Sequence, residues 1–115
     1  MDSIVIAEDD PRLRDLYVRL LSRLGRVCAF GSAEEALPWL GKARLLVTDL
    51  EMPGMGGLAL LNHAAAVKPD LATVVVSACP ARSGANGLAD VVLGKPFEAA
   101  TLLEVCTRLL KPVTI

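Results

Sequence analysis

The sequence is poor in aromatic residues, and it has no apolar run long enough to cross a bilayer. Only 3% of its 115 residues are aromatic while 53% are apolar, so we expect an aliphatic core. A chain of this length has room for one compact domain and not for two. The longest apolar runs, such as residues 71–79, fall well short of the roughly 20 residues that a membrane-spanning helix needs. The sequence therefore predicts one globular domain that does not span a membrane.

Cysteine is also scarce, and charge of neither sign is in large excess. Cys28, Cys79 and Cys106 are odd in number, widely spaced and without a C-x-x-C pair, which favours reduced thiols. The chain has 12 basic and 13 acidic residues, and this net charge of −1 argues against a nucleic-acid-binding surface. The N-terminus lacks a basic start followed by an apolar stretch, so we expect a cytoplasmic location.

Short apolar segments alternate with amphipathic ones along the chain. The expected strands are residues 3–7, 26–30, 45–48, 71–77 and 90–93, and the expected helices are residues 11–24, 32–41, 58–68 and 98–110. Asp10 can cap the first helix with Pro11 at its first position, and Ser32 with Glu35 forms a capping box for the second. The alternation implies right-handed crossovers and an α/β fold, with a central parallel five-stranded sheet and helices on both faces.

Two stretches weaken this regular pattern. Pro38 lies inside the second expected helix and disfavours its continuation. Residues 79–87 include Pro80, Gly84, Asn86 and Gly87, which break helices. We therefore expect the fourth helix, between the last two strands, to be shortened or distorted.

Polar residues stand at the carboxyl ends of four expected strands, where ligands collect in parallel sheets. They are Glu8 and Asp9 after the first strand, Asp49 after the third, Ser77 at the end of the fourth and Lys95 after the fifth. Carboxylates about 5 Å apart repel by roughly 3 kcal/mol per pair at an effective dielectric near 20, so a cation must lie among them. Oxygen ligands favour Mg²⁺. Asp49 can then attack a phosphoryl donor and form an aspartyl phosphate, while Lys95 neutralises charge and Ser77 donates its hydroxyl.

Four stretches resemble, in order, the motifs of response regulator receiver domains of two-component signalling, the CheY-like family. They are residues 4–11 (IVIAEDDP), 48–55 (TDLEMPGM), 77–78 (SA) and 95–97 (KPF), and the resemblance runs from about residue 3 to residue 110. It implies a flavodoxin-like (βα)5 fold and a single receiver domain over residues 1–115. It also implies that a histidine kinase or histidine phosphotransfer protein phosphorylates Asp49, which changes the binding of a downstream protein target. Such a phosphoprotein is not a turnover enzyme, because it catalyses only its own phosphorylation and dephosphorylation.

The same resemblance implies roles for individual residues. The catalytic residues would be Asp49, Ser77 and Lys95, and the phosphoryl group would be bound by Ser77, Ala78 and Lys95. Mg²⁺ would be held by Asp9, Asp49 and the backbone carbonyl of Glu51, with Glu8 reaching it through water. The Lys95-Pro96 peptide bond would be cis, which is uncommon outside special turns.

Three departures from the family pattern keep other hypotheses open. Val92 stands where an aromatic residue is common, Gly56 where an acid is common, and residues 77–95 are about one helical turn shorter than usual. A pseudo-receiver that acts only as a protein-interaction module is therefore a second hypothesis. A third is a hydrolase of the haloacid-dehalogenase kind, which shares the Asp, Ser/Thr and Lys set. That class needs Asp two residues after the nucleophile, where this chain has Glu51.

Other residues and motifs are given no functional role. We interpret Asp10 as a helix cap and not as a metal ligand, and we assign no functional role to His63. Residues 54–59 match a G-x-G-x-x-A dinucleotide pattern, but no acid follows at the required distance. Gly94 and Lys95 lack the Ser/Thr of a phosphate-binding loop.

Overall fold

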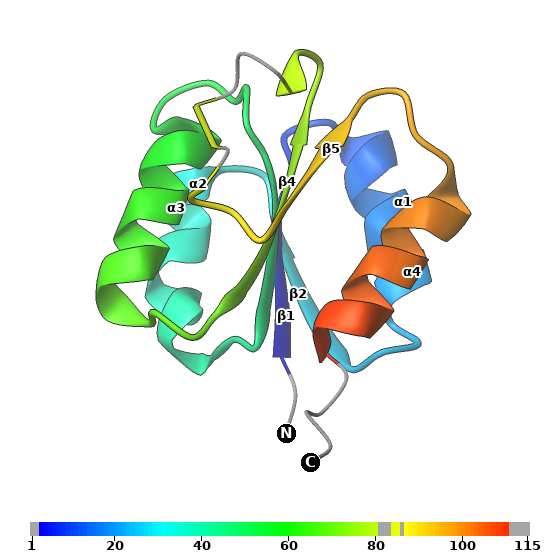
Figure 1. The fold of residues 1–115 in the computed structure, drawn as a ribbon, viewed down its shortest axis with the longest axis horizontal. Helices are drawn as coiled ribbons and strands as arrows, with labels where there is room; N and C mark the ends of the chain where they lie inside the picture. Colours follow the sequence, from blue (N-terminus) through cyan, green and yellow to red (C-terminus); the bar gives the residue numbers. More distant parts are fainter. Residues whose placement is uncertain (1–2, 81–83, 86, 111–115) are drawn as a thin grey trace.

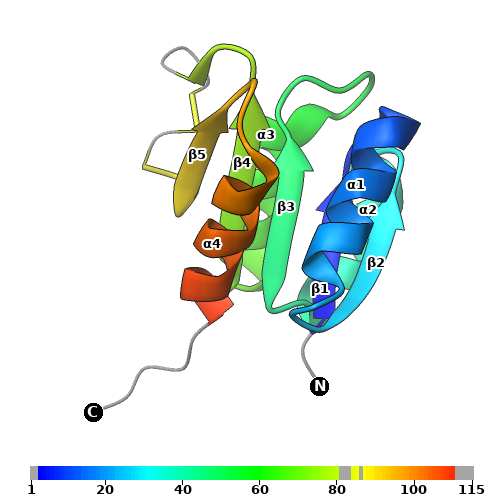
Figure 2. The same ribbon diagram turned by 90° about the vertical axis from the view of Figure 1, so that its right-hand side faces the viewer.

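The computed structural model describes residues 3–80, 84–85 and 87–110. Its strands form one parallel sheet in the order β2-β1-β3-β4-β5, with β2 and β5 at opposite edges (Figure 2). The strands are β1 (Ser3–Ala7), β2 (Arg26–Phe30), β3 (Leu45–Asp49), β4 (Ala72–Ser77) and β5 (Val91–Gly94). The predicted fold class is confirmed, and every strand boundary lies within one residue of its predicted position.

Helices cover both faces of the sheet (Figure 1). α1 (Pro11–Leu21) and α4 (Ala99–Leu110) lie on one face, and α2 (Ala33–Ala36), the 3-10 helix η1 (Leu37–Lys42) and α3 (Gly56–Val67) lie on the other. Successive side chains of β1 enter different cores, since Ile4 and Ile6 pack with α1 and α4, whereas Val5 and Ala7 pack with α2 and α3. All four are fully buried, as expected of a central strand in a sheet covered on both sides.

The first helix begins as predicted but ends early. Asp10 Oδ1 accepts a hydrogen bond from Arg12 N–H at 2.9 Å, which confirms Asp10 as the cap of α1. The helix ends at Leu21 and not at residue 24. The N–H of Leu24 bonds to the carbonyl of Leu21, three residues back instead of four, so the chain tightens into a turn before Gly25.

The second expected helix is split in two. Ser32 caps α2 as predicted, because its hydroxyl accepts a hydrogen bond from Glu35 N–H at 3.2 Å. The α-helix then gives way to η1 at Leu37. Pro38 explains the change, since it has no N–H to donate to the carbonyl of residue 34 and its ring crowds that carbonyl.

Between β4 and β5, Pro80 is in 3-10 conformation, and the described residues from Gly84 to Asp90 contain no helix. The carbonyl of Ala85 accepts hydrogen bonds from Leu88 and Ala89, which makes a single turn. Gly84 and Gly87 have φ angles of +72° and +85°, a conformation that does not continue a right-handed helix. The predicted shortening of the fourth helix fits these residues, and residues 81–83 and 86 lie outside the described part.

Candidate functional site

The strand ends bring the predicted polar residues together. Asp49 ends β3 and Ser77 ends β4, while Glu8 and Lys95 directly follow β1 and β5. Backbone hydrogen bonds continue the sheet past the strand ends, because Glu8 N–H donates to the Phe30 carbonyl at 3.0 Å and Lys95 N–H donates to the Ser77 carbonyl at 2.8 Å. The backbone of Glu8 and of Lys95 is therefore held by the hydrogen bonds of the sheet.

One ammonium group lies beside two of the three clustered carboxylates in this site. Lys95 Nζ lies 3.0 Å from Asp49 Oδ1 and 3.9 Å from Glu8 Oε1. Glu8, Asp9 and Asp49 each offer a carboxylate oxygen, and these oxygens lie within 4.8 Å of one another. The structure thus brings together Glu8, Asp9, Asp49 and Lys95 as predicted, and it leaves a net negative charge at the site.

Burial sets the protonation of these groups. Glu8 is 1% and Asp49 is 5% exposed. The pKa of Glu8 is raised to about 7, mainly by burial and also by the charge of Asp49, against the opposing effects of the Asp10 backbone hydrogen bond and the Lys95 charge. Burial also raises the pKa of Asp49, against the opposing effect of Lys95. Burial on its own would lower the pKa of Lys95, but its ion pair with Asp49 outweighs this and raises it.

The donor atoms fit a hard divalent cation. Glu8 Oε1 and Asp49 Oδ1 are buried and make no hydrogen bond among the described residues, although both face Lys95 as ion-pair partners. Buried carboxylate oxygens without such partners are costly, and one lysine does not balance three acids. All the ligand atoms on offer are oxygens, which is the donor set that Mg²⁺ prefers.

Hydrogen bonds from the start of α1 fix both the carboxylate and the backbone carbonyl of Glu8. The N–H of Asp10 donates to Glu8 Oε2 at 3.1 Å, and Arg14 Nη1 donates to the Glu8 carbonyl at 3.0 Å. Sequence reasoning missed Arg14, whose only signal is its place one turn into α1, on the side facing this carbonyl. Asp9 is exposed at the mouth of the cluster, while Asp10 serves as the cap and is not among the three clustered acids.

Ser77 and Glu51 are joined in a way that the sequence did not indicate. The Ser77 hydroxyl donates to Glu51 Oε1 at 2.9 Å and accepts from Cys79 N–H at 3.1 Å. Ser77 is fully buried, whereas Glu51 is exposed. Glu51 was predicted to contribute only its backbone carbonyl, and Ala78 follows β4 in an exposed position.

The first turn of α3 packs directly against the end of β3. A Cβ atom on Gly57 would lie 2.2 Å from the Asp49 carbonyl oxygen and 2.8 Å from Leu50 Cα, so only glycine fits there. The N–H of Gly57 donates to the Leu50 carbonyl at 2.9 Å. Gly57 thus allows the helix to hold the strand end that carries Asp49.

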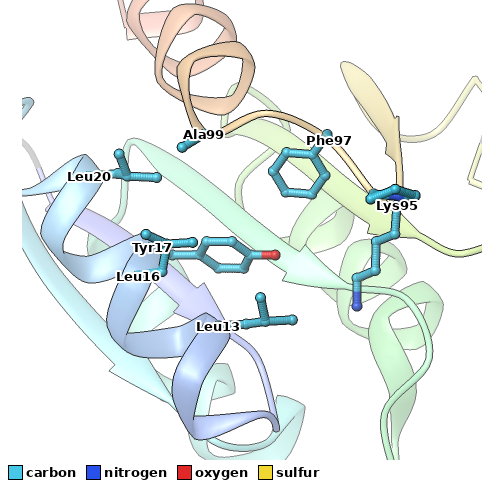
Figure 3. Close-up of a pocket in the computed structure, with 8 residues that line it drawn as sticks. Leu13, Leu16, Tyr17, Leu20, Lys95, Phe97 and Ala99 are labelled. Carbon is cyan, nitrogen blue, oxygen red and sulfur yellow. The ribbon is translucent and has the colours of Figure 1, made fainter.

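An apolar cavity of about 430 Å³ lies beside the acidic site, between α1 and the connection from β5 to α4 (Figure 3). Its lining consists of Leu13, Leu16, Tyr17, Leu20, Lys95, Pro96, Phe97 and Ala99. The ring of Tyr17 stacks on Phe97 with centroids 6.2 Å apart, and its hydroxyl end points toward Lys95. The predicted cis bond between Lys95 and Pro96 is confirmed. Lys95 therefore belongs both to the acidic site and to the wall of an apolar cavity.

The cysteines and the histidine are not among the clustered acids and Lys95. The three cysteines are free, with Cys106 buried, Cys28 half-buried and Cys79 exposed. Burial raises the pKa of Cys106 to about 12, so this thiol is unreactive. His63 is exposed on α3.

A parallel sheet with acids at the ends of β1 and β3 and a lysine after β5 defines a flavodoxin-like domain with an acidic pocket at the carboxyl ends of its strands. The chain matches the family model of the response regulator receiver domain over residues 4–107, and it belongs to this family. Its acidic pocket is consistent with Mg²⁺-dependent phosphorylation of an aspartate. The family is one of signalling receivers and not of enzymes, and membership implies a cognate kinase partner.

Individual relatives agree with this assignment. The chain is 31% identical to the response regulator receiver protein CpdR of Brucella abortus, covering 96% of this chain and 98% of CpdR. It is 34% identical to the transcriptional regulator NtrC of Azospirillum brasilense, covering 97% of this chain but only 25% of that protein. The response regulator TrrA of Thermotoga maritima, solved in complex with Mg²⁺ and BeF, superposes with a TM-score of 0.84 at 28% identity, covering 96% of this chain and all of TrrA.

The chain thus spans about a quarter of several curated relatives and nearly the whole of another. Within the part of the chain that the structure describes, the helices are too short or too polar to pass through a bilayer.

Proposed function

We propose that the chain acts as a single receiver domain in which Asp49 accepts a phosphoryl group from a phosphohistidine of a kinase or phosphotransfer protein. The modified domain then binds a downstream protein with altered affinity. The observation that carries this proposal is the Lys95–Asp49 ion pair at 3.0 Å, set in a cluster of three acids, two of them buried, that one lysine does not balance. Asp49 thus has a cationic partner already in contact with the oxygen that would carry the phosphoryl group or lie beside it.

The transfer is a displacement at phosphorus. An oxygen of Asp49 forms the new P–O bond while the P–N bond to the donor imidazole breaks, and the imidazole leaves with the bonding electron pair. Lys95, whose ammonium is already at the carboxylate, neutralises charge on the transferred oxygens. Ser77 donates its hydroxyl to one of these oxygens, and the backbone N–H of Ala78, the residue after β4, donates to another.

Residues of this chain can also hold the metal. Asp9, Asp49 and the Glu51 backbone carbonyl would bind Mg²⁺, and Glu8 would reach it through water. When bound, the metal supplies positive charge beside the transferred phosphoryl group. The complex of the relative TrrA with Mg²⁺ and BeF supports this part of the proposal. The acidic trio supports it independently.

The experiment is phosphorylation by a small donor. Incubated with acetyl phosphate and Mg²⁺, the protein should gain one phosphoryl group in its intact mass. The D49N variant should gain none, and EDTA should abolish the gain in the unmodified chain. A protein that folds and binds Mg²⁺ but acquires no phosphoryl group on Asp49 would refute the proposal.

A pseudo-receiver is the alternative that two observations favour. Val92 is a half-buried aliphatic residue where family members often carry an aromatic one, and residues 85–89, before β5, make a single turn among the described residues. Partner binding measured with unmodified, phosphorylated and D49A protein separates the two functions. Equal affinity in all three states would support a pure interaction module.

A further inference from the structure

The hydroxyl of Ser77 has one proton, and in this structure that proton is committed to Glu51. The Ser77 oxygen donates to Glu51 Oε1 at 2.9 Å and at the same time accepts from Cys79 N–H at 3.1 Å. A serine hydroxyl is a single donor. It therefore cannot serve Glu51 and an oxygen of a phosphoryl group on Asp49 at once.

The two partners differ in their freedom to move. Ser77 is fully buried at the end of a central strand and is bound through its carbonyl to Lys95 N–H. Glu51 is exposed, two residues beyond Asp49. The Leu50 backbone before it is fixed by Val76 and Gly57. The bond can therefore open by rotation of the Glu51 side chain alone, without a change in the core.

Charge adds to this competition. The Glu51 carboxylate acts on Asp49 and on Lys95, since it raises the pKa of both groups. A phosphoryl group on Asp49 would bring further negative charge next to Glu51 and would need the same proton from Ser77. In the resting state Glu51 thus accepts the Ser77 proton that an oxygen of the phosphoryl group would need.

Building on the proposed function, we propose that Glu51 is an autoinhibitory acceptor that holds the Ser77 hydroxyl and slows phosphorylation of Asp49. Phosphoryl transfer requires an exchange in which Ser77 releases Glu51 and donates to the incoming oxygen. Once Asp49 is phosphorylated, repulsion keeps Glu51 turned toward the solvent. Glu51 acts here through Ser77 and is not itself a catalytic residue.

The test is a double-mutant cycle on the rate of phosphorylation by acetyl phosphate, followed by intact mass. E51A should raise the rate constant roughly three- to tenfold, the range given by the net free energy of one hydrogen bond. E51Q keeps an acceptor but no charge and should raise it less. D70N removes a charge at an exposed residue before β4 and is the matched control, with no expected change.

The S77A background distinguishes the contact from simple charge repulsion. E51A should give no acceleration there, whereas it should accelerate the reaction in S77T, which retains a hydroxyl. If S77A reacts too slowly to follow, the affinity for beryllium fluoride with Mg²⁺ gives the same comparison without covalent chemistry. The unfolding temperature of E51A should fall by no more than the few degrees that the loss of one hydrogen bond costs, which shows that the variant remains folded.

Each outcome decides the question. An E51A rate that is unchanged or lower overturns the inference, and so does equal acceleration with and without the Ser77 hydroxyl. Acceleration confined to backgrounds with a hydroxyl supports it. Absence of phosphorylation in every protein, the unmodified chain included, rejects the proposed function itself and is thus recognisably a different result.

Discussion

Lys95 Nζ lies 3.0 Å from Asp49 Oδ1, and this ion pair spans β4 to join the ends of two strands that are not neighbours in the sheet. The Lys95 side chain is 28% exposed, so its ammonium can shift toward a new anion while the Asp49 carboxylate stays buried. The pair is the shortest of the charge contacts among the site residues of the described chain. It places positive charge where a phosphoryl group on Asp49 would develop negative charge.

Replacing this lysine should therefore disable the reaction. K95M should lower the rate constant for phosphorylation by acetyl phosphate by at least about 100-fold, the usual effect of removing a group that stabilises transition-state charge. K42M, which changes an exposed lysine in η1, is the control and should leave the rate unchanged. A K95M protein that reacts at the normal rate would show that Lys95 has only a structural role.

Mg²⁺ should stabilise the fold through the exposed acid of the cluster. At a concentration of about 100 times its dissociation constant, the metal should add roughly 2.7 kcal/mol to the free energy of unfolding, or about 10 °C in a thermal scan. D9N should remove this gain, since Asp9 is one of the three clustered acids. D10N should retain it, because Asp10 lies outside the cluster and asparagine also caps helices. Equal gains in both variants would contradict the assignment.

Glu8 should make the metal-free protein less stable as the pH rises. Its pKa is raised from the ordinary value of 4.5 to about 7, mainly by burial, so between these values the folded state binds more protons than the unfolded state. The stabilisation is complete below the lower value and is lost as the pH passes 7. Relative to E8Q, which cannot ionise, the protein in EDTA should lose on the order of 3 kcal/mol between pH 4.5 and pH 8.

The ionisation of Glu8 should also control the affinity of the site for Mg²⁺. Because Mg²⁺ binds the ionised carboxylates, its affinity should rise over the pH range in which the metal-free fold weakens. Urea unfolding with EDTA and calorimetric titration with Mg²⁺ measure the two trends. Parallel stability profiles for E8Q and the unmodified chain would show that Glu8 is already ionised near pH 5.

Gly57 should tolerate no side chain. The Cβ of an alanine would lie 2.2 Å from the carbonyl oxygen of Asp49, so G57A has to push α3 away from the end of β3. We expect a loss of about 1–3 kcal/mol in the free energy of unfolding, together with slower phosphorylation, because the displaced backbone is that of the acceptor. Gly41 has open space around its Cα, and G41A is the matched control. Chemical denaturation of both variants provides the comparison.

A pair of hydrogen bonds should anchor the edge strand. Thr73 N–H donates to Asp90 Oδ2 at 2.8 Å, and Asp90 N–H donates to Thr73 Oγ1 at 3.0 Å. D90A leaves the buried Thr73 N–H without its acceptor and should cost about 1–2 kcal/mol in stability. D90N keeps an acceptor oxygen and should cost less. Amide exchange at Thr73 should accelerate in D90A, while the rate of Asp49 phosphorylation stays unchanged, since both residues lie at the far end of β4 from the site.

The strands and most of the site could be predicted because each depends on a few residues that are neighbours in the sequence. A strand that is apolar on both faces and then meets an acid, as residues 45–49 do, places that acid at the edge of a parallel sheet. The same reasoning located Glu8, Ser77 and Lys95. The cap at Asp10 and the break at Pro38 also depend on a few neighbouring residues, and both are confirmed.

The parts that were missed depend on side-chain rotamers and on contacts between distant segments. The hydrogen bond from Ser77 to Glu51 joins residues 26 positions apart, and nothing in the local sequence indicates which way an exposed glutamate turns. Arg14 reaches the Glu8 carbonyl only because α1 packs at a particular angle on β1. The early end of α1 was missed because Leu24 continues the apolar periodicity beyond the last helical turn.

The positions of the acids and of the lysine along the sequence determine when during folding their charges can balance. The three acids come from the first half of the sequence, whereas the lysine that faces them follows the last strand, at the edge of the sheet. A nascent chain released only as far as β4 would hold its acids together with no internal counter-charge. Addition of β5 therefore both completes the sheet and brings Lys95 to the acids. A truncated domain without β5 would be less stable and would accept a phosphoryl group less readily.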